Sequence, residues 1–197
     1  MEDTNLADSQ SSDEQGLWLA FKQGDRRAFE LIYRKHINPL ISYGYKITSN
    51  RSLIQDCIQD LFVELWESRE RLTDAASVKY YLLRSLRYKL IRALQLTPTE
   101  DIQEIDIEVS DDNFETKLLA DEIATQQALK LSNALQLLPK RQREAIHLRY
   151  FQEMNNEEVA HIMGVGYQSA CKFIYTGLKT LRDLMQLSAV ISFLLKF

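Results

Sequence analysis

The residues of this chain whose types and spacing best suit a chemical task are the arginines and tyrosines between residues 78 and 94. Drawn as a helix, this stretch gathers aliphatic side chains on one arc and guanidinium and phenol groups on the other. Guanidinium groups neutralise phosphates, and aromatic rings stack on unstacked bases for about 1 to 3 kcal/mol each. The polar arc, which carries Tyr80, Tyr81, Arg84, Arg87, Tyr88 and Arg92, therefore suits single-stranded nucleic acid. The candidate DNA contacts on it are Tyr80, Arg84, Arg87 and Tyr88. An ordinary exposed helix whose arginines pair with acids is the alternative.

A second stretch, Ser52 to Glu70, combines an apolar stripe with an acidic face. The stripe predicts a core-facing helix and comprises Ile54, Ile58, Leu61, Phe62, Leu65 and Trp66. The opposite arc carries Asp56, Gln59 and Asp60, with Val63 among them. Charged arcs usually face water, so taken alone this one is interpreted as a solvated surface.

The remaining reactive residue types form no catalytic or metal-binding pattern. The three histidines, His36, His147 and His161, have no carboxylate or cysteine companions at ligand spacing. Neither a nucleophile with its base nor a glycine-rich phosphate loop is present in the sequence. Cys57 and Cys171 lie far apart within helical patterns, which indicates a reduced, cytoplasmic protein. We therefore expect a non-enzyme with no catalytic residue, metal, cofactor or small-molecule substrate.

Composition indicates an all-α protein that binds a polyanion. Hydrophobic residues make up 45% of the chain, and six glycines and three prolines are too few for the turns of an all-β fold. The net charge of −4 conceals two basic segments, with 14 basic against eight acidic residues over 16–99 and nine against five over 123–197. The acids gather in 1–15, which holds five, and in 100–122, which holds ten and one lysine. This layout is typical of nucleic-acid-binding proteins.

Helical periodicity divides the chain into two small domains. Helices are expected at 17–21, 28–43, 52–70 and 78–94, with Asp25 as an N-cap, and they form a first domain over 16–95. A helix at 114–138 and another at 141–151, which Pro139 opens, begin a second domain over 122–187. Residues 1–15 are expected to be a disordered acidic tail without signal-peptide features, and 96–121 an extended acidic linker despite the alternation of Ile105, Ile107 and Val109.

The second domain contains a helix-turn-helix pattern. Residues 157–163 predict a short helix, Gly164 a left-handed turn position, and 167–184 a longer second helix. The core between the two helices is expected to comprise Val159, Ala160, Met163, Val165, Ala170 and Ile174. The side chains that point away, where a recognition helix meets the major groove, are Gln168, Ser169, Lys172, Tyr175 and Thr176.

The order of these features resembles the bacterial RNA polymerase sigma factors of the extracytoplasmic-function (ECF) type. The first domain resembles their region two in Gly24-Asp25, Ala28-Phe29, Tyr33 and Asp56-x-x-Gln59-Asp60-x-Phe62-x-x-Leu65-Trp66. The second resembles region four in Leu138-Pro139-x-Arg141-Gln142-Arg143, Leu148-Arg149-Tyr150-Phe151, Glu157-Glu158-Val159-Ala160 and Met163-Gly164-Val165. The resemblance covers roughly residues 17–94 and 131–184.

The resemblance implies a function and partners. Asp56, Gln59 and Asp60 match positions that dock on the clamp helices of the largest subunit of core RNA polymerase. The basic and aromatic helix matches the segment that opens and reads the minus-ten element of promoter DNA, and the loop 71–77 matches one that captures a flipped base. The second helix of the helix-turn-helix would read the minus-thirty-five element. The acidic linker would thread through the polymerase channel later used by RNA, while a plain tether is the alternative.

Two other functions stay open. A stand-alone helix-turn-helix regulator would bind DNA without polymerase, and a degenerate sigma-like protein would only sequester partners. The second gains support because Cys171, Phe173 and Thr176 stand where family members typically carry Lys or Arg, which predicts weak or polymerase-dependent upstream binding. The apolar tail 188–197, in a run too short to span a bilayer, is expected to extend the last helix and pack on its own domain. Alternatively it covers a functional face or meets an anti-sigma factor.

Overall fold

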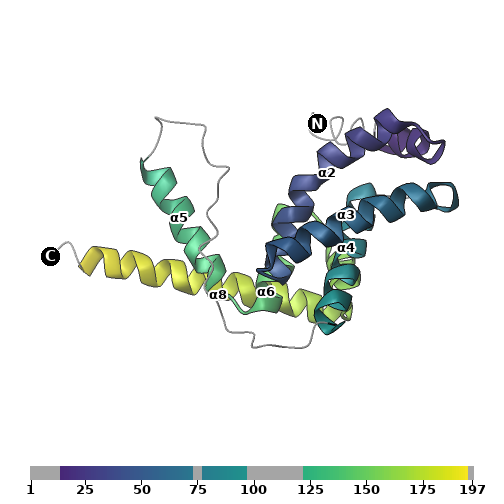
Figure 1. Cartoon of the computed structure of the whole chain (residues 1–197). Helices are drawn as coiled ribbons and strands as arrows, with labels where there is room; N and C mark the ends of the chain where they lie inside the picture. Colours follow the sequence, from purple (N-terminus) through teal and green to yellow (C-terminus); the bar gives the residue numbers. More distant parts are fainter. Residues whose placement is uncertain (1–13, 73–76, 97–121, 195–197) are drawn as a thin grey trace, which may run out of the picture.

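The structure, a computed structural model, describes residues 14–72, 77–96 and 122–194, and for 122–128 and 186–194 it describes the backbone alone. Over these ranges every regular element is helical, which confirms the all-α expectation (Figure 1). Among the described residues no helix is long and apolar enough to cross a membrane. The tail before residue 14, the linker 97–121 with its alternating Ile105, Ile107 and Val109, and loop residues 73–76 lie outside the description.

Four helices form the first domain: one over 14–22, α2 (Arg26–Ile47), α3 (Arg51–Ser68) and α4 (Val78–Leu96). A short 3₁₀ turn, η1 (Arg69–Arg71), follows α3. Asp25 caps α2 as expected, since its Oδ1 accepts from the backbone N–H of Arg27 at 2.7 Å. Asn50 caps α3 in the same way through Leu53 N at 3.0 Å. The first helix begins at Glu14, inside the expected tail of residues 1–15, and the Glu14 carboxylate pairs with Lys35 of α2.

The core of this domain uses the apolar stripes that the sequence predicts. All six stripe residues of α3 are buried except Trp66, which is half-buried, and Val78, Leu82, Leu83, Leu86 and Leu90 of α4 are all buried. Aromatic rings join the helices, with the Phe29 ring centroid 5.1 Å from that of Trp66. α2 and α3 approach closely at Gly44, where an added Cβ would lie 2.7 Å from Ile54 Cγ2. These contacts hold the outer face of α3 toward solvent.

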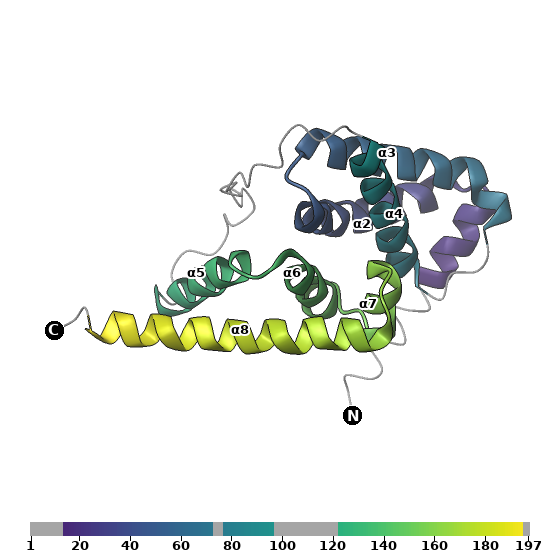
Figure 2. The same ribbon diagram turned by 90° about the horizontal axis from the view of Figure 1, so that it is seen from below.

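The second domain contains α5 (Glu122–Gln136), α6 (Lys140–Ile146), α7 (Asn156–Met163) and α8 (Tyr167–Leu194). Between α6 and α7 the chain forms a π-helical segment, η2 (His147–Phe151), where the sequence predicts a continuous α-helix. Pro139 is the N-cap of α6 rather than its first helical residue. α8 continues to Leu194, so the apolar segment does extend the last helix. Figure 2 shows α5, α6 and α7 along one side of α8.

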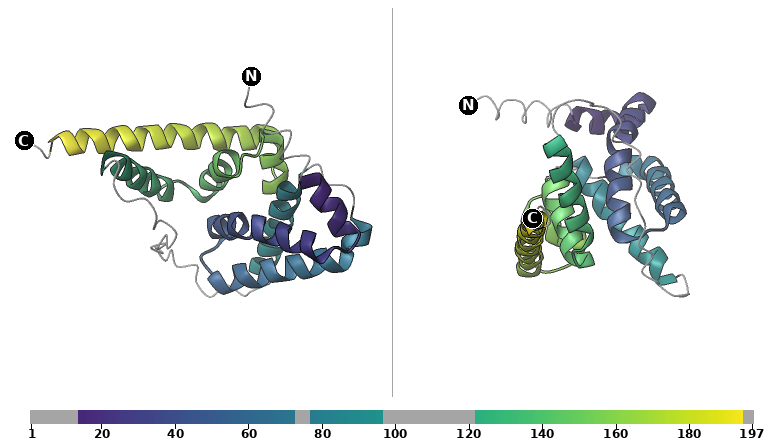
Figure 3. Two further views of the ribbon diagram at one scale, coloured as in Figure 1. Left: turned by 90° about the horizontal axis from the view of Figure 1, so that it is seen from above. Right: turned by 90° about the vertical axis from the view of Figure 1, so that its left-hand side faces the viewer.

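The two domains contact each other directly. α7 packs on α4 and α6 packs on α2, so the first domain covers the side of the second that faces away from α8 (Figures 1 and 3). One cluster of buried apolar residues runs through both domains, and it includes Leu86 and Leu90 of α4 as well as Leu148 and Val159. A second, smaller cluster of Ala134, Leu138, Ile146 and Leu181 packs α5 and α6 on α8. The first domain and the helix-turn-helix therefore pack on each other through the larger cluster, while α5 packs within the second domain.

Candidate nucleic-acid and polymerase interfaces

The outer face of α3 is uncovered. Asp56, Gln59, Asp60 and Val63 are all exposed, and Val63 is 50% exposed. They lie opposite the buried stripe that packs on α2 and α4. Between the two faces the Cys57 thiol is buried, and burial together with the Asp60 carboxylate raises its pKa. The thiol thus stays protonated, and α3 presents a carboxylate, amide and valine surface.

The four side chains of α4 that are predicted to contact single-stranded DNA differ in their exposure to solvent. Arg84 and Tyr88 are exposed, Tyr88 by 67%. Tyr80 is half-buried against the core. Arg87 is also half-buried, because its guanidinium points toward the second domain, where its Nε donates to Glu144 Oε1 at 2.7 Å. In this conformation the structure brings two of the four together at the surface.

Glu144 is a residue that the sequence reasoning missed. Its side chain is 7% exposed and lies on α6, where Oε1 accepts from Arg87 and from Tyr43 Oη at 3.0 Å. The Arg141 guanidinium is 3.6 Å from Oε2. Burial and the Glu144 carboxylate raise the pKa of Tyr43, so the phenol remains a donor. The sequence did offer one signal for it, because Glu144 stands beside Ala145 and Ile146 on the apolar arc of its helix. A carboxylate in such a position indicates a buried ion pair, since buried charges are rare unless paired.

The helix-turn-helix forms as expected. Asn155 and Glu158 make a reciprocal capping box at the start of α7. Gly164 ends α7 with φ 62°, the left-handed conformation that the sequence predicts. Of the expected core between the helices only Val165 is not fully buried. Turn and caps together fix the angle at which α8 leaves α7.

The first turns of α8 present the expected polar face. Gln168, Ser169, Lys172 and Tyr175 are exposed, Tyr175 by 70%, whereas the Thr176 hydroxyl donates to the backbone carbonyl of Lys172 at 2.7 Å.

At two of the three positions where sigma factors typically carry Lys or Arg, the side chain of this protein points partly inward. Phe173 is half-buried against the core, and Cys171 is half-buried with its Sγ 3.5 Å from Asn156 Nδ2. Lys172 is thus the cation that this face offers near its start.

Two of the three histidines, His36 and His147, have structural partners. His36 Nε2 lies 3.1 Å from a Glu14 oxygen, and this hydrogen bond lowers the pKa of Glu14. The His147 ring lies nearly parallel to the rings of Tyr43 and Phe151, with centroids 6.3 and 5.3 Å away. Burial, with smaller contributions from nearby lysines, lowers the pKa of His147 to about 3. In the described part of the chain no group of three His, Cys, Asp or Glu residues could hold a metal ion.

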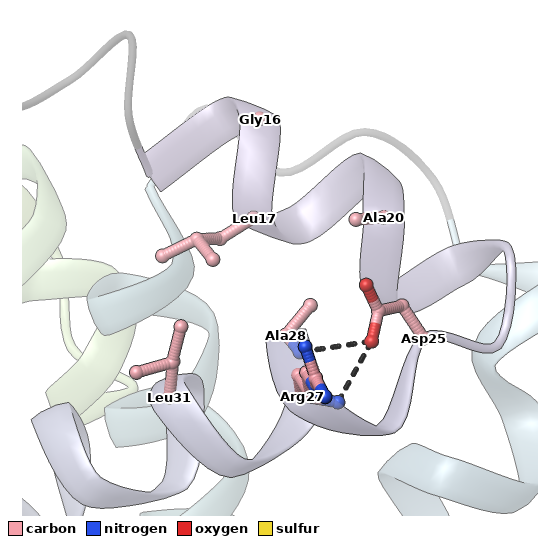
Figure 4. A pocket seen from close by; sticks show the side chains of 7 residues that line it. All are labelled: Gly16, Leu17, Ala20, Asp25, Arg27, Ala28 and Leu31. Carbon is pink, nitrogen blue, oxygen red and sulfur yellow. Dashed lines mark hydrogen bonds between the residues drawn. The ribbon is translucent and has the colours of Figure 1, made fainter.

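A surface hollow lies between the helix at 14–22 and α2. It is lined by two charged residues, Asp25 and Arg27, and by Gly16, Leu17, Ala20, Ala28 and Leu31 (Figure 4). The Asp25 Oδ1 already accepts from two backbone N–H groups of α2 (Figure 4). The Asp25 carboxylate therefore serves as the N-cap of α2.

Comparisons with known proteins agree with this geometry. The family model for Sigma-70 region 2 matches residues 32–96, and that for Sigma-70 region 4 matches residues 128–181. The sigma factor SigZ of Bacillus subtilis (strain 168) is 21% identical over 148 residues, which are 75% of this chain and 81% of SigZ.

Two solved structures share the fold. CnrH, in complex with the cytosolic domain of CnrY, has a TM-score of 0.58 and 17% identity over 88% of this chain and 97% of its own. RpoE of Bartonella quintana, in complex with the anti-sigma factor NepR, has a TM-score of 0.56 and 18% identity over 80% of this chain and 96% of its own.

These matches identify the class of this protein: it is an RNA polymerase initiation factor with the promoter-recognition regions two and four. The chain belongs to the sigma-70 family, as a sigma factor of the ECF type. Members of this class bind core RNA polymerase and promoter DNA and direct transcription from promoters, and they are generally non-enzymatic.

Proposed function

We propose that this sigma factor docks on core RNA polymerase through the outer face of α3, reads the minus-ten element through α4, and contacts the minus-thirty-five element through the start of α8. It acts in the cytoplasm and has no catalytic activity of its own. The docking residues are Asp56, Gln59, Asp60 and Val63. The DNA-contacting residues are Tyr80, Arg84, Arg87 and Tyr88 for the minus-ten element, and Gln168, Ser169, Lys172, Tyr175 and Thr176 for the minus-thirty-five element.

The exposed face of α3 is the observation that carries the docking assignment. The opposite stripe of this helix is fully used by α2 and α4, so folding alone does not require two carboxylates around an exposed valine. A small apolar centre within a polar rim is the usual composition of a protein interface. An acidic face also suits a protein partner, because nucleic acid would be repelled by it.

The surface of α8 supports upstream binding that depends on the polymerase. Each neutralised phosphate contributes to affinity, and this face has one exposed lysine near its start. Tethering to the enzyme raises the effective concentration of the domain at the promoter, which offsets a weak intrinsic affinity. The polar Gln168 and Ser169 can still hydrogen-bond to base edges.

Run-off transcription with core polymerase and a genomic promoter library tests the docking face. The combined substitutions Asp56→Ala, Gln59→Ala and Asp60→Ala should abolish core binding and transcripts while preserving the helix, because alanine has the highest helix propensity. The matched control is Glu30→Ala, which removes an exposed acid of α2 that pairs with Arg34. Initiation by the triple variant at the control's level would refute the docking assignment.

An anti-sigma factor is a further partner that we propose, since a solved structure of similar fold, RpoE, is held in complex with one. The uncovered face of α3 is available to such an antagonist, which would then compete with core polymerase. We expect any captured antagonist to compete with core polymerase for the wild-type chain. This competition should be lost in the triple variant.

A further inference from the structure

The contact between the two domains engages a residue proposed to read DNA. Arg87 lies on the polar arc of α4, yet its side chain is 11% exposed and its guanidinium is bonded to Glu144 of the second domain. The turn of the helix-turn-helix closes over the same group, since a Cβ at Gly164 would lie 3.8 Å from Arg87 Nη1. In this arrangement Arg87 cannot reach a phosphate or a base.

The carboxylate that holds Arg87 is itself fixed from the first domain. Glu144 accepts a second hydrogen bond from Tyr43 of α2, so two helices of one domain converge on one side chain of the other. The Tyr43 ring also stacks near His147, with an interplanar angle of 11°. Apolar packing of α7 on α4 and α6 on α2 is non-directional. The buried triad of Tyr43, Arg87 and Glu144 therefore supplies directional contacts between the two domains.

We propose that Glu144 is an intramolecular substitute for a DNA phosphate, which holds Arg87 and keeps the two domains closed until promoter DNA replaces it. A carboxylate and a phosphate both accept charge-assisted hydrogen bonds from guanidinium, so the two compete for one group. The inference rests on the proposed function of α4. It goes beyond that function, because it assigns Glu144 and Tyr43 to a closed state of the free protein.

The closed state leaves the polymerase-docking face open. The docking residues Asp56, Gln59, Asp60 and Val63 of α3 are exposed, and Arg84 and Tyr88 on α4 stay accessible. The free protein can thus dock on polymerase while closed, and engagement of DNA through Arg87 requires the domains to part. Opening and DNA binding are then thermodynamically coupled, so any change that weakens closure raises the affinity for DNA.

Two substitutions at Glu144 test the closure in the full-length protein. Glu144→Gln removes the charge of the carboxylate. Glu144→Asp keeps the charge but shortens the side chain by one methylene, so the net charge of this variant and its unspecific attraction to DNA are unchanged. The matched control is Glu157→Gln, which removes an exposed acid from the first turn of α7. Circular dichroism first establishes that each variant is folded, and Glu144→Asp carries the test if the glutamine variant is not.

Small-angle X-ray scattering measures closure without DNA, and fluorescence anisotropy measures affinity for a single-stranded oligonucleotide of the minus-ten element. We expect both Glu144 variants to show a larger radius of gyration and about tenfold tighter binding than the control, within the roughly 5- to 150-fold range of allosteric coupling. An unchanged radius overturns the closure even where α4 binds DNA. A larger radius without tighter binding overturns the competition with phosphate. Absence of oligonucleotide binding in every variant contradicts the function proposed for α4, while the radius still reports on the closure.

Discussion

The close approach of α2 and α3 at Gly44 makes the stability of the first domain sensitive to one methyl group. An alanine Cβ at this position would lie 2.7 Å from Ile54 Cγ2 and 3.2 Å from Ile54 Cγ1. Favourable carbon contacts are about 3.5 to 4.0 Å apart. Ile54 is 1% exposed and β-branched, so it can neither swing into solvent nor change rotamer freely.

Two effects of opposite sign decide the outcome of Gly44→Ala. Overpacking a core costs about 1 to 3 kcal/mol. Replacing glycine by alanine within a helix gains up to about 1 kcal/mol, and less in a last turn such as the one that holds Gly44. We therefore expect a net loss of about 1 to 2 kcal/mol in the free energy of unfolding.

Urea unfolding followed by tryptophan fluorescence measures this loss, because both tryptophans, Trp18 and Trp66, lie in the first domain. Gly16→Ala is the control, since a Cβ there meets nothing within 4 Å and the propensity gain acts alone. In an Ile54→Ala background the clash disappears, so Gly44→Ala should become neutral or stabilising. Equal stability of Gly44→Ala and Gly16→Ala would refute the reasoning.

Three further results are expected. The pKa of His147 is about 3 in the folded protein against an ordinary value of 6.5, so between pH 3 and 6.5 only the unfolded chain binds the proton. The free energy of unfolding should therefore fall with decreasing pH in this range, by on the order of 1 kcal/mol per pH unit. Urea unfolding at a series of acidic pH values should show a flatter dependence for His147→Phe. Gly164→Ala should destabilise the second domain by about 1 kcal/mol, because φ is 62° there, whereas an equal thermal midpoint would contradict this. Lys172→Ala should reduce the slope of log K against log salt for holoenzyme on promoter duplex by about 0.9, and an unchanged slope would remove Lys172 from the phosphate contacts.

The apolar faces of the helices could be predicted from sequence because they repeat every 3.6 residues within one element. This local regularity identified the buried stripes of α3 and α4. The capping role of Asp25 and the left-handed turn at Gly164 followed from residue type at the helix ends. Helical periodicity also placed the acidic face of α3 toward solvent, and this face together with the order of motifs indicated the sigma-factor class.

Only the tertiary structure decided how the polar arcs are used. Periodicity assigned Arg87 to a DNA-reading face, but its partner is 57 residues away on a helix that is adjacent only after folding. Tyr43 and Glu144 are 101 residues apart for the same reason. Helix phase is set by neighbours along the chain, whereas the pairing of buried charges is set by which helices pack together. The sequence by itself therefore determined which arc of each helix is apolar and which is polar, and the packing of its two domains determined that Arg87 is held by Glu144.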